Sequence, residues 1–409
     1  MAQIFQQQAG GIMGMFNMFA GGALERMSIF ALGILPYISA SIILQLMTTI
    51  SPTMEQLKKE GESGRKKINQ YTRYLTVVLA AVQSWGLAIG LEGMSAGAGS
   101  AVIDPGMFFR LTTVITIVGG TMFLMWLGEQ ITARGIGNGI SLIIFVGIVA
   151  EIPAALVQFF EQGRSGALST PVILGVIVMV IAVIAFVVFM ERALRKISIL
   201  YPRRQVGMKV YEGGSSHLPI KVNPAGVIPA IFASSILLLP TTVSTFSGGS
   251  TNPVLSWLAA NLGYGQPLHL VFLAAMIVFF AYFYTLNVSF KVDDVAENLK
   301  NQNASVPGIR PGKKTEEYLE YVVNRVLVLG AAYLAAVCLL PEILISRVGI
   351  PFYFGGTSVL IVVSVTMDTI QQVQSHLLAH QYEALIEKSQ LRGRKKPGAK
   401  AAPRAPARR

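Results

Sequence analysis

Charged residues are scarce in this chain. Asp, Glu, Lys and Arg make up 13% of its 409 residues, against about 25% in an average soluble domain. Hydrophobic residues make up 53%, and the mean hydropathy is +0.57. This balance excludes a disordered protein and disfavours a water-soluble globule, because too little polar surface would cover so much apolar volume. A single cysteine, Cys338, excludes a disulfide framework within the chain.

The long apolar segments also contain few ionisable residues. Glu129, Glu151 and Asp368 lie near segment ends or alone, and no Lys or Arg lies at a segment's middle. Ion-coupled transporters carry such groups at membrane depth, so a secondary solute transporter is the weaker alternative. His376 and His380 have the spacing of a zinc-protease motif but lack its glutamate. With no nucleophile–base pair visible either, we expect no enzyme, no cofactor and no bound metal.

Nine apolar segments approach or exceed the roughly 20 residues that a membrane-spanning helix requires. They are residues 29–50, 75–91, 108–128, 139–160, 171–190, 224–244, 267–288, 322–344 and 352–372. The pattern predicts an all-α polytopic membrane protein with nine transmembrane helices.

Basic residues collect in alternate connections between these segments. All but four of the 33 Lys and Arg residues fall on one side; the exceptions are Arg26, Arg110, Arg164 and Arg347. Lys and Arg accumulate on the cytoplasmic side of membrane proteins, so the C-terminus is expected there. Nine spans would then place Met1 outside, yet the first residues contain no signal peptide. We therefore expect that an upstream helix is absent from this chain.

Two basic connections, 191–223 and 289–321, are longer than topology alone requires. Both are predicted to be hairpin-like, and in the second the sequence VPGIRPG holds Arg310 in a stiff turn. They favour docking surfaces for an acidic or nucleic-acid-bearing partner. The alternative is a pair of topology determinants that contact anionic lipids. The tail, 376–409, ends in a Pro-, Ala- and Arg-rich run that predicts disorder.

Other features interrupt the simple pattern of spans. Residues 10–22, GGIMGMFNMFAGG, would form a helix of about 15 Å, half the hydrocarbon thickness. This piece must lie at the interface or re-enter a protein-lined cavity. Pro36 and Pro229 fall inside spans, where proline mostly kinks a helix. The sequence GIGNG at 135–139 joins two membrane helices and is predicted to be a turn.

Several blocks of sequence resemble the bacterial SecY family, the protein-conducting channel of the Sec translocon. They are MFNMFAGGALERMSIFALGILPYISASIILQL (15–46), KKEGESGRKKINQYTRY (58–74), GTMFLMWLGEQITARGIGNGISLIIF (120–145), NPAGVIPAIFASSILLLP (223–240), VPGIRPG (306–312) and PFYFGGTSVLIVV (351–363). The resemblance runs through essentially the whole chain in order. The family has ten transmembrane helices and a cytoplasmic N-terminus, so its first helix is the one expected to be missing.

The resemblance implies a SecY-type inverted-repeat bundle of two halves around a central pore. The N-terminal half would be residues 26–161 with four helices, and the C-terminal half residues 162–375 with five, followed by the basic cytoplasmic tail. Residues 1–25 would contain a short re-entrant plug that closes the channel at rest. The implied plug residues are Ile12, Met15, Phe16, Met18 and Phe19.

The resemblance also implies an apolar constriction, or pore ring. Its expected members are Ile34, Ile38, Ile140, Ile144, Ile231 and Ile361. A spacing of four residues puts Ile34 and Ile38 on one helix face. A ring of branched apolar side chains yields to a moving polypeptide and excludes water by dewetting. From the sequence pattern alone, these isoleucines would instead be assigned to lipid contact or packing.

The implied lateral gate opens between segments 29–50 with 75–91 and 224–244 with 267–288. Pro36, Ser39, Pro229 and Ser235 are the candidate gate residues. For docking, Arg310 is the first candidate, and Arg203, Arg204 and Lys209 are weaker ones.

The partners implied are SecE and SecG in a heterotrimer, the SecA motor ATPase, the ribosome, and preproteins that carry signal sequences. SecDF, YidC and anionic lipids are further candidate partners. The implied location is the bacterial cytoplasmic (inner) membrane.

Overall fold

The computed structural model describes residues 20–24, 26–93, 95–96, 99–100, 102, 104–166, 169–202, 204–206, 209–211, 214–246, 261, 266–348 and 356–393. The chain divides into two compact units, Met1–Val365 and Thr366–Arg409. The first unit holds every element up to the start of α14 (Gly356–Gly393), and the second holds the rest of that helix.

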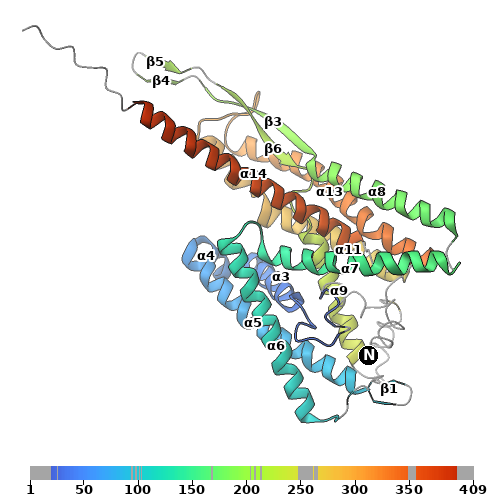
Figure 1. Cartoon of the computed structure of the whole chain (residues 1–409). Helices are drawn as coiled ribbons and strands as arrows, with labels where there is room; N and C mark the ends of the chain where they lie inside the picture. Colours follow the sequence, from blue (N-terminus) through green and yellow to red (C-terminus); the bar gives the residue numbers. More distant parts are fainter. Residues whose placement is uncertain are drawn as a thin grey trace, which may run out of the picture. The chain divides into compact units, whose positions relative to one another are not determined.

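The N-terminal part of the first unit is built from α3 to α7 (Figure 1). The helices are α3 (Leu35–Ile50), α4 (Pro52–Lys59), α5 (Glu62–Gly93), α6 (Met107–Arg134) and α7 (Gly139–Arg164). The short antiparallel strands β1 (Ser95–Ala96) and β2 (Gly99–Ser100) lie between α5 and α6. α5 packs against both α3 and α6, and α6 packs against α7.

The C-terminal part contains further helices and two strand pairs. Its helices are α8 (Thr170–Arg192), α9 (Ile228–Phe246), α11 (Pro267–Tyr284) with the π-helical turn η1 (Thr285–Ser289), α12 (Val292–Asn301), α13 (Lys313–Val348) and the start of α14. α11 packs against α9 and α13, while α8 contacts α13. α9 also packs against α3 and α5, which joins the two parts.

Six helices within the described residues are long and apolar enough to cross a membrane. They are Glu62–Glu92, Met107–Arg134, Gly139–Arg164, Thr170–Arg192, Pro267–Asn301 and Lys313–Ile343. α3 and α9 are shorter apolar helices, and α14 begins within the ninth predicted segment. Each of the nine predicted segments therefore contains a helix, and the chain is a multi-pass helical membrane protein.

The turn predicted at 135–139 is confirmed, and it brings α6 and α7 into close contact. The Asn138 side chain caps α7 by accepting a hydrogen bond of 3.1 Å from the Ile140 backbone N–H. A Cβ atom at Gly139 would lie 2.1 Å from the carbonyl oxygen of Gly128, so only glycine fits there. Such small residues let membrane helices approach closely.

The prediction that Pro36 and Pro229 kink their helices is wrong. Each is the second residue of its helix, α3 or α9, where the N–H that proline lacks would have no intrahelical partner. Residues 29–34 form turns instead of the predicted helix, and Gly33 adopts φ +54° there. Ile34 is accordingly the residue before α3, not a member of the same helical face as Ile38.

The first long connection is a β-hairpin, as predicted. β3 (Leu194–Leu200) pairs antiparallel with β6 (Ser215–Lys221), and β4 (Arg204–Val206) pairs with β5 (Lys209–Tyr211). The hairpin expected at 289–321 is wrong, because VDDVAENLKN forms α12. Its acidic first turn and basic last turn suit the helix dipole, and its apolar residues at i and i+3 face a core.

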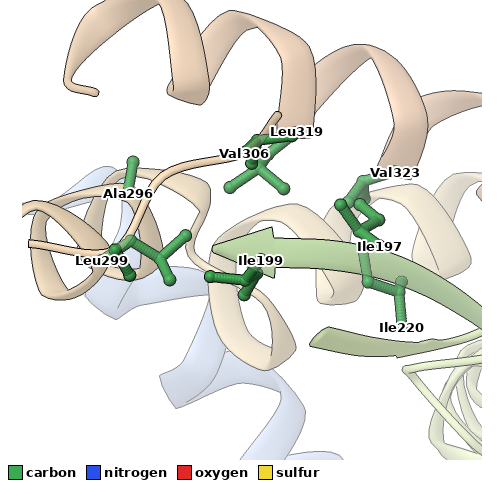
Figure 2. Close-up of a cluster of buried hydrophobic side chains, with 9 residues drawn as sticks. Ile197, Ile199, Ile220, Ala296, Leu299, Val306, Leu319 and Val323 are labelled. Atoms are coloured by element: carbon green, nitrogen blue, oxygen red, sulfur yellow. The ribbon is translucent and has the colours of Figure 1, made fainter. Parts of the chain in front are cut away.

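That core joins the two connections (Figure 2). Its nine buried side chains come from β3, β6, α12, the following turn and α13: Ile197, Ile199, Ile220, Ala296, Leu299, Ala304, Val306, Leu319 and Val323. Backbone hydrogen bonds of 2.8 and 2.9 Å also pair Leu200 with Ser305. We call this unit, residues 194–221 with 292–323, the platform.

Candidate channel, gate and docking surface

Five of the six pore-ring isoleucines are buried. Ile34, Ile38, Ile144, Ile231 and Ile361 are between 0% and 7% exposed. Burial excludes the alternative in which these five side chains face lipid. It is equally compatible with ordinary packing and with a constriction, so the ring stays a prediction.

The sixth, Ile140, is half-buried near the start of α7. A Cβ atom built on Gly128 of α6 would lie 3.2 Å from its Cγ1 atom. Part of the Ile140 side chain therefore fills the contact between α6 and α7.

The four candidate gate residues lie on two helices that pack against each other. Pro36 and Ser39 are on α3, Pro229 and Ser235 are on α9, and all four are buried. Because α9 also packs against α5, one helix of the C-terminal part contacts two helices of the N-terminal part. We call this contact of α9 with α3 and α5 the seam. α9 is in contact with both helices in this structure.

Sequence analysis missed one buried polar residue on α5. Gln83 on α5 is 9% exposed, and its Oε1 atom has no hydrogen-bond partner among the described residues. A buried amide oxygen without a partner costs about 1–3 kcal/mol. The only signal in the sequence was a polar residue within an apolar segment.

Two ion pairs hold α5 to α6 at opposite ends of the pair. Nε of Arg73 donates a hydrogen bond of 3.1 Å to Oε1 of Glu129. Nε of Arg110 donates one of 2.9 Å to Oε2 of Glu92, which also accepts through Oε1 from the Gly106 backbone. These contacts between guanidinium and carboxylate fix the position of α5 relative to its neighbour.

The platform presents Arg310 on a fixed loop. Arg310 is exposed, while its carbonyl oxygen accepts a hydrogen bond of 2.9 Å from the Thr315 hydroxyl. Gly308 and Gly312 on either side adopt φ +79° and +104°, which L side chains rarely adopt. The stiff turn predicted from VPGIRPG is confirmed, and the loop is anchored by Val306 in the shared core.

The weaker docking candidates lie at the far end of the hairpin. Arg204 on β4 is paired with Tyr211, and Lys209 on β5 is paired with Val206. Arg203 lies outside the described residues, as do the five plug residues Ile12, Met15, Phe16, Met18 and Phe19.

Basic residues between α3 and α5 lie near the residue that precedes α12. Burial lowers the pKa of Lys58 on α4, and the nearby Lys291 and Arg65 lower it further. Lys59 has the opposite shift: its Nζ lies 2.8 Å from Oε1 of Glu55, and this hydrogen bond raises the lysine pKa. Because Lys58 of α4 interacts with Lys291, basic groups from the N-terminal and C-terminal parts of the chain lie close together.

Comparison with known proteins identifies the relatives of this chain. The SecY family model matches residues 28–370. The protein translocase subunit SecY of Pseudomonas aeruginosa is 55% identical over 396 residues, covering 96% of this chain and 88% of that protein. The corresponding subunit of Escherichia coli K12 is 54% identical with the same coverage, and that of Rickettsia bellii is 50% identical over 96% of this chain and 90% of that protein.

Solved structures of low sequence identity share the fold. A protein-conducting channel has a TM-score of 0.63 at 19% identity, covering 88% of this chain and 84% of that chain. Sec61 in a canine ribosome–channel complex has a TM-score of 0.58 at 19% identity, covering 84% and 81%. The family model covers most of the chain and the relatives are at least half identical, so this chain belongs to the SecY family.

Proposed function

We propose that this chain is the central protein-conducting channel of a Sec translocon. It passes unfolded preproteins across the membrane and releases apolar segments sideways into lipid. The observation that carries the proposal is the seam: α9 packs against α3 and α5, and the candidate gate residues on α3 and α9 are buried. A contact between two helix sets is what a gate toward lipid requires.

The proposed pore ring works by size and water exclusion. Branched apolar side chains part around a polypeptide of any sequence without binding it strongly, and they dewet when the pore is empty. The burial of Ile34, Ile231 and Ile361 supports this role, because side chains that contact lipid could not line a pore. The plug, within residues 1–25, would add a second closure on the outer side.

The proposed gate acts by partition. A signal sequence that intercalates at the seam gains about 0.8 kcal/mol for each CH₂ group that it buries in lipid. Polar stretches gain nothing there and continue along the pore. The chain itself is not an enzyme in this mechanism, since SecA or the ribosome supplies the driving force.

The platform is the proposed docking surface for SecA and the ribosome. Arg310 supports this role because its side chain is exposed while its backbone is fixed. Arg203, Arg204 and Lys209 would extend the surface along the hairpin. A fixed basic group binds phosphate or carboxylate at a lower entropic cost than a flexible one.

The remaining partners follow from the same assignment. SecE and SecG would complete a heterotrimer, SecDF and YidC would associate with it, and anionic lipids would contact the basic connections. The basic connections and the C-terminus would face the cytoplasm of a bacterium, with the chain in its inner membrane.

A solute transporter is the second function to test, because sequence analysis missed a buried ionisable pair between two helices of the bundle. His269 on α11 and Glu342 on α13 lie together and are buried. The pair involves the third residue of α11, at a helix end and not midway along it. This position suits a contact that joins two helices better than an ion path.

Reconstitution distinguishes the two functions. Vesicles containing this chain with SecE and SecG are mixed with SecA, ATP and a preprotein, and transport is scored by protection from added protease. Protection that requires ATP and this chain is expected. Saturable uptake of a small solute without any protected preprotein would overturn the proposal.

A further inference from the structure

The segment before α9 is held by one buried side chain. Nδ2 of Asn223, which is 4% exposed, donates a hydrogen bond of 2.9 Å to Oε1 of Glu191 and one of 3.0 Å to the carbonyl oxygen of Gly226. Glu191 is at the C-terminal end of α8, and Gly226 is two residues before α9. The contact therefore joins the end of one helix to the start of the next across the whole hairpin.

The backbone around Asn223 is tied down as well. Gly226 adopts φ +61°, which favours glycine at this turn. The hydroxyl of Ser289, the last residue of η1, donates a hydrogen bond of 2.7 Å to the carbonyl oxygen of Pro224. The start of α9 is thereby attached to the end of α11 as well as to α8.

α13 closes the third side of this contact. A Cβ atom at Gly330 would lie 2.4 Å from the carbonyl oxygen of Val222, so the two backbones touch. Tyr333, one turn further along α13, lies close enough to Glu191 to interact with its charge. The Tyr333 ring also contacts Phe186 of α8, with ring centroids 5.7 Å apart.

The polar contact of Ser234, further along α9, is of another kind. The hydroxyl of Ser234 is buried but donates only within its own helix, to the carbonyl oxygens of Ala230 and Ile231 at 3.0 Å each. Such a contact does not restrain the helix relative to its neighbours. The hydrogen bonds of Asn223 and Ser289 thus act between elements, on the segment that leads into α9.

We propose that Asn223 and Glu191 are positioning residues that anchor the first end of α9, so that the seam opens by a tilt of this helix about the anchored end. The inference rests on the proposed channel function and names the pivot of its gate. α9 has 19 residues and a length of about 28 Å, so a tilt of about 15° moves its far end by roughly 7 Å. The anchored end hardly moves.

The test exchanges donor and acceptor. Asn223→Asp places a second carboxylate against Glu191, which replaces a hydrogen bond by repulsion. The double variant Asn223→Asp with Glu191→Gln restores the bond between the two side chains, because the glutamine amide donates to the new carboxylate, but it does not restore the bond to the Gly226 carbonyl. Glu191→Gln alone keeps an acceptor oxygen toward Asn223. Ser234→Ala is the matched control on the same helix.

The readout is how strictly the gate selects its substrates. In reconstituted vesicles, Asn223→Asp is expected to raise transport of a preprotein with a defective signal sequence by about tenfold, the effect of losing one charge-assisted hydrogen bond. Ion leak through resting vesicles should rise with it. Glu191→Gln and Ser234→Ala should stay within about twofold of wild type, since each keeps both hydrogen bonds of Asn223. The double variant should fall between wild type and Asn223→Asp, because it regains the bond to residue 191 but not the one to the Gly226 carbonyl.

Each outcome decides a separate question. Wild-type chain that transports no preprotein at all would refute the channel function. Normal selectivity of Asn223→Asp, or a double variant as leaky as the single one, would refute the anchor while the channel function stands. Thermal unfolding of each purified complex accompanies the assay. A double variant that regains thermal stability but not selectivity would show a structural role only and overturn the proposal.

Discussion

Nε2 of His269 on α11 lies 3.1 Å from Oε1 of Glu342 on α13, and the two side chains are 6% and 5% exposed. Two buried polar side chains that face each other in this way each lower the desolvation cost of the other. Removing one partner is costly, since it leaves the other buried group uncompensated. The pair therefore holds α11 and α13 in one arrangement.

Replacing Glu342 by alanine should destabilise the chain by about 1–3 kcal/mol, the cost of leaving a buried polar group without its neighbour. Thermal unfolding in detergent measures the effect. Glu317→Ala, at an exposed position of the same helix, is the control and should leave the midpoint unchanged. Equal midpoints for the two variants would mean that the pair does not hold the helices together.

Ile361→Asn and Ile34→Asn should loosen the closed channel. A polar amide in an apolar constriction admits water, so ion leak and transport of defective signal sequences should both increase. Conductance across planar bilayers measures the leak. Ile115→Asn makes the same exchange at a side chain that is 72% exposed on α6 and should not increase either quantity. Wild-type behaviour of both ring variants would remove these residues from the ring.

Arg310→Glu should reduce transport that depends on SecA or the ribosome by at least tenfold, because charge reversal turns an attraction into a repulsion. The folded channel should be unaffected, as the Arg310 side chain is exposed. Binding of labelled SecA or ribosomes to the reconstituted complex measures docking directly. Lys314→Glu makes the same charge reversal at a neighbouring exposed residue and is the control. An equally large loss of transport in this control would indicate a general effect of charge and not a role of Arg310.

Gln83→Leu should stabilise the folded chain. The substitution removes a buried oxygen that has no partner among the described residues, and removing that cost is worth about 1–3 kcal/mol. Thermal unfolding in detergent should therefore shift to a higher midpoint. Gln70→Leu, at an exposed position of the same helix, provides the comparison. A midpoint for Gln83→Leu below that of wild type would contradict the expectation.

The positions of the helices could be predicted from sequence because each depends on its own local hydropathy. Every predicted apolar segment contains a helix, and the turn before α7 and the hairpin after α8 are where the pattern put them. The two errors at Pro36 and Pro229 have a local cause too, since proline is as well suited to the first turn of a helix as to a kink.

The contacts between helices could not be predicted in this way. Glu191 and Asn223 are 32 residues apart, and neither belongs to a motif with a known spacing. Burial of the isoleucines follows from composition, but the side that each one faces depends on how the helices pack. The platform was missed for the same reason. The sequence of α12 alone resembles a loop, and its apolar side is recognised only from its packing against β3 and β6.

The single core shared by the two long connections has a mechanical consequence. β3 continues from α8, β6 leads to α9, and the same core includes residues of α12 and α13. A large partner that binds Arg310 is therefore connected, through one packed core, to the ends of three membrane helices: α8, α9 and α13. Force applied to this surface would be transmitted to α9 through the core instead of being absorbed by flexible loops.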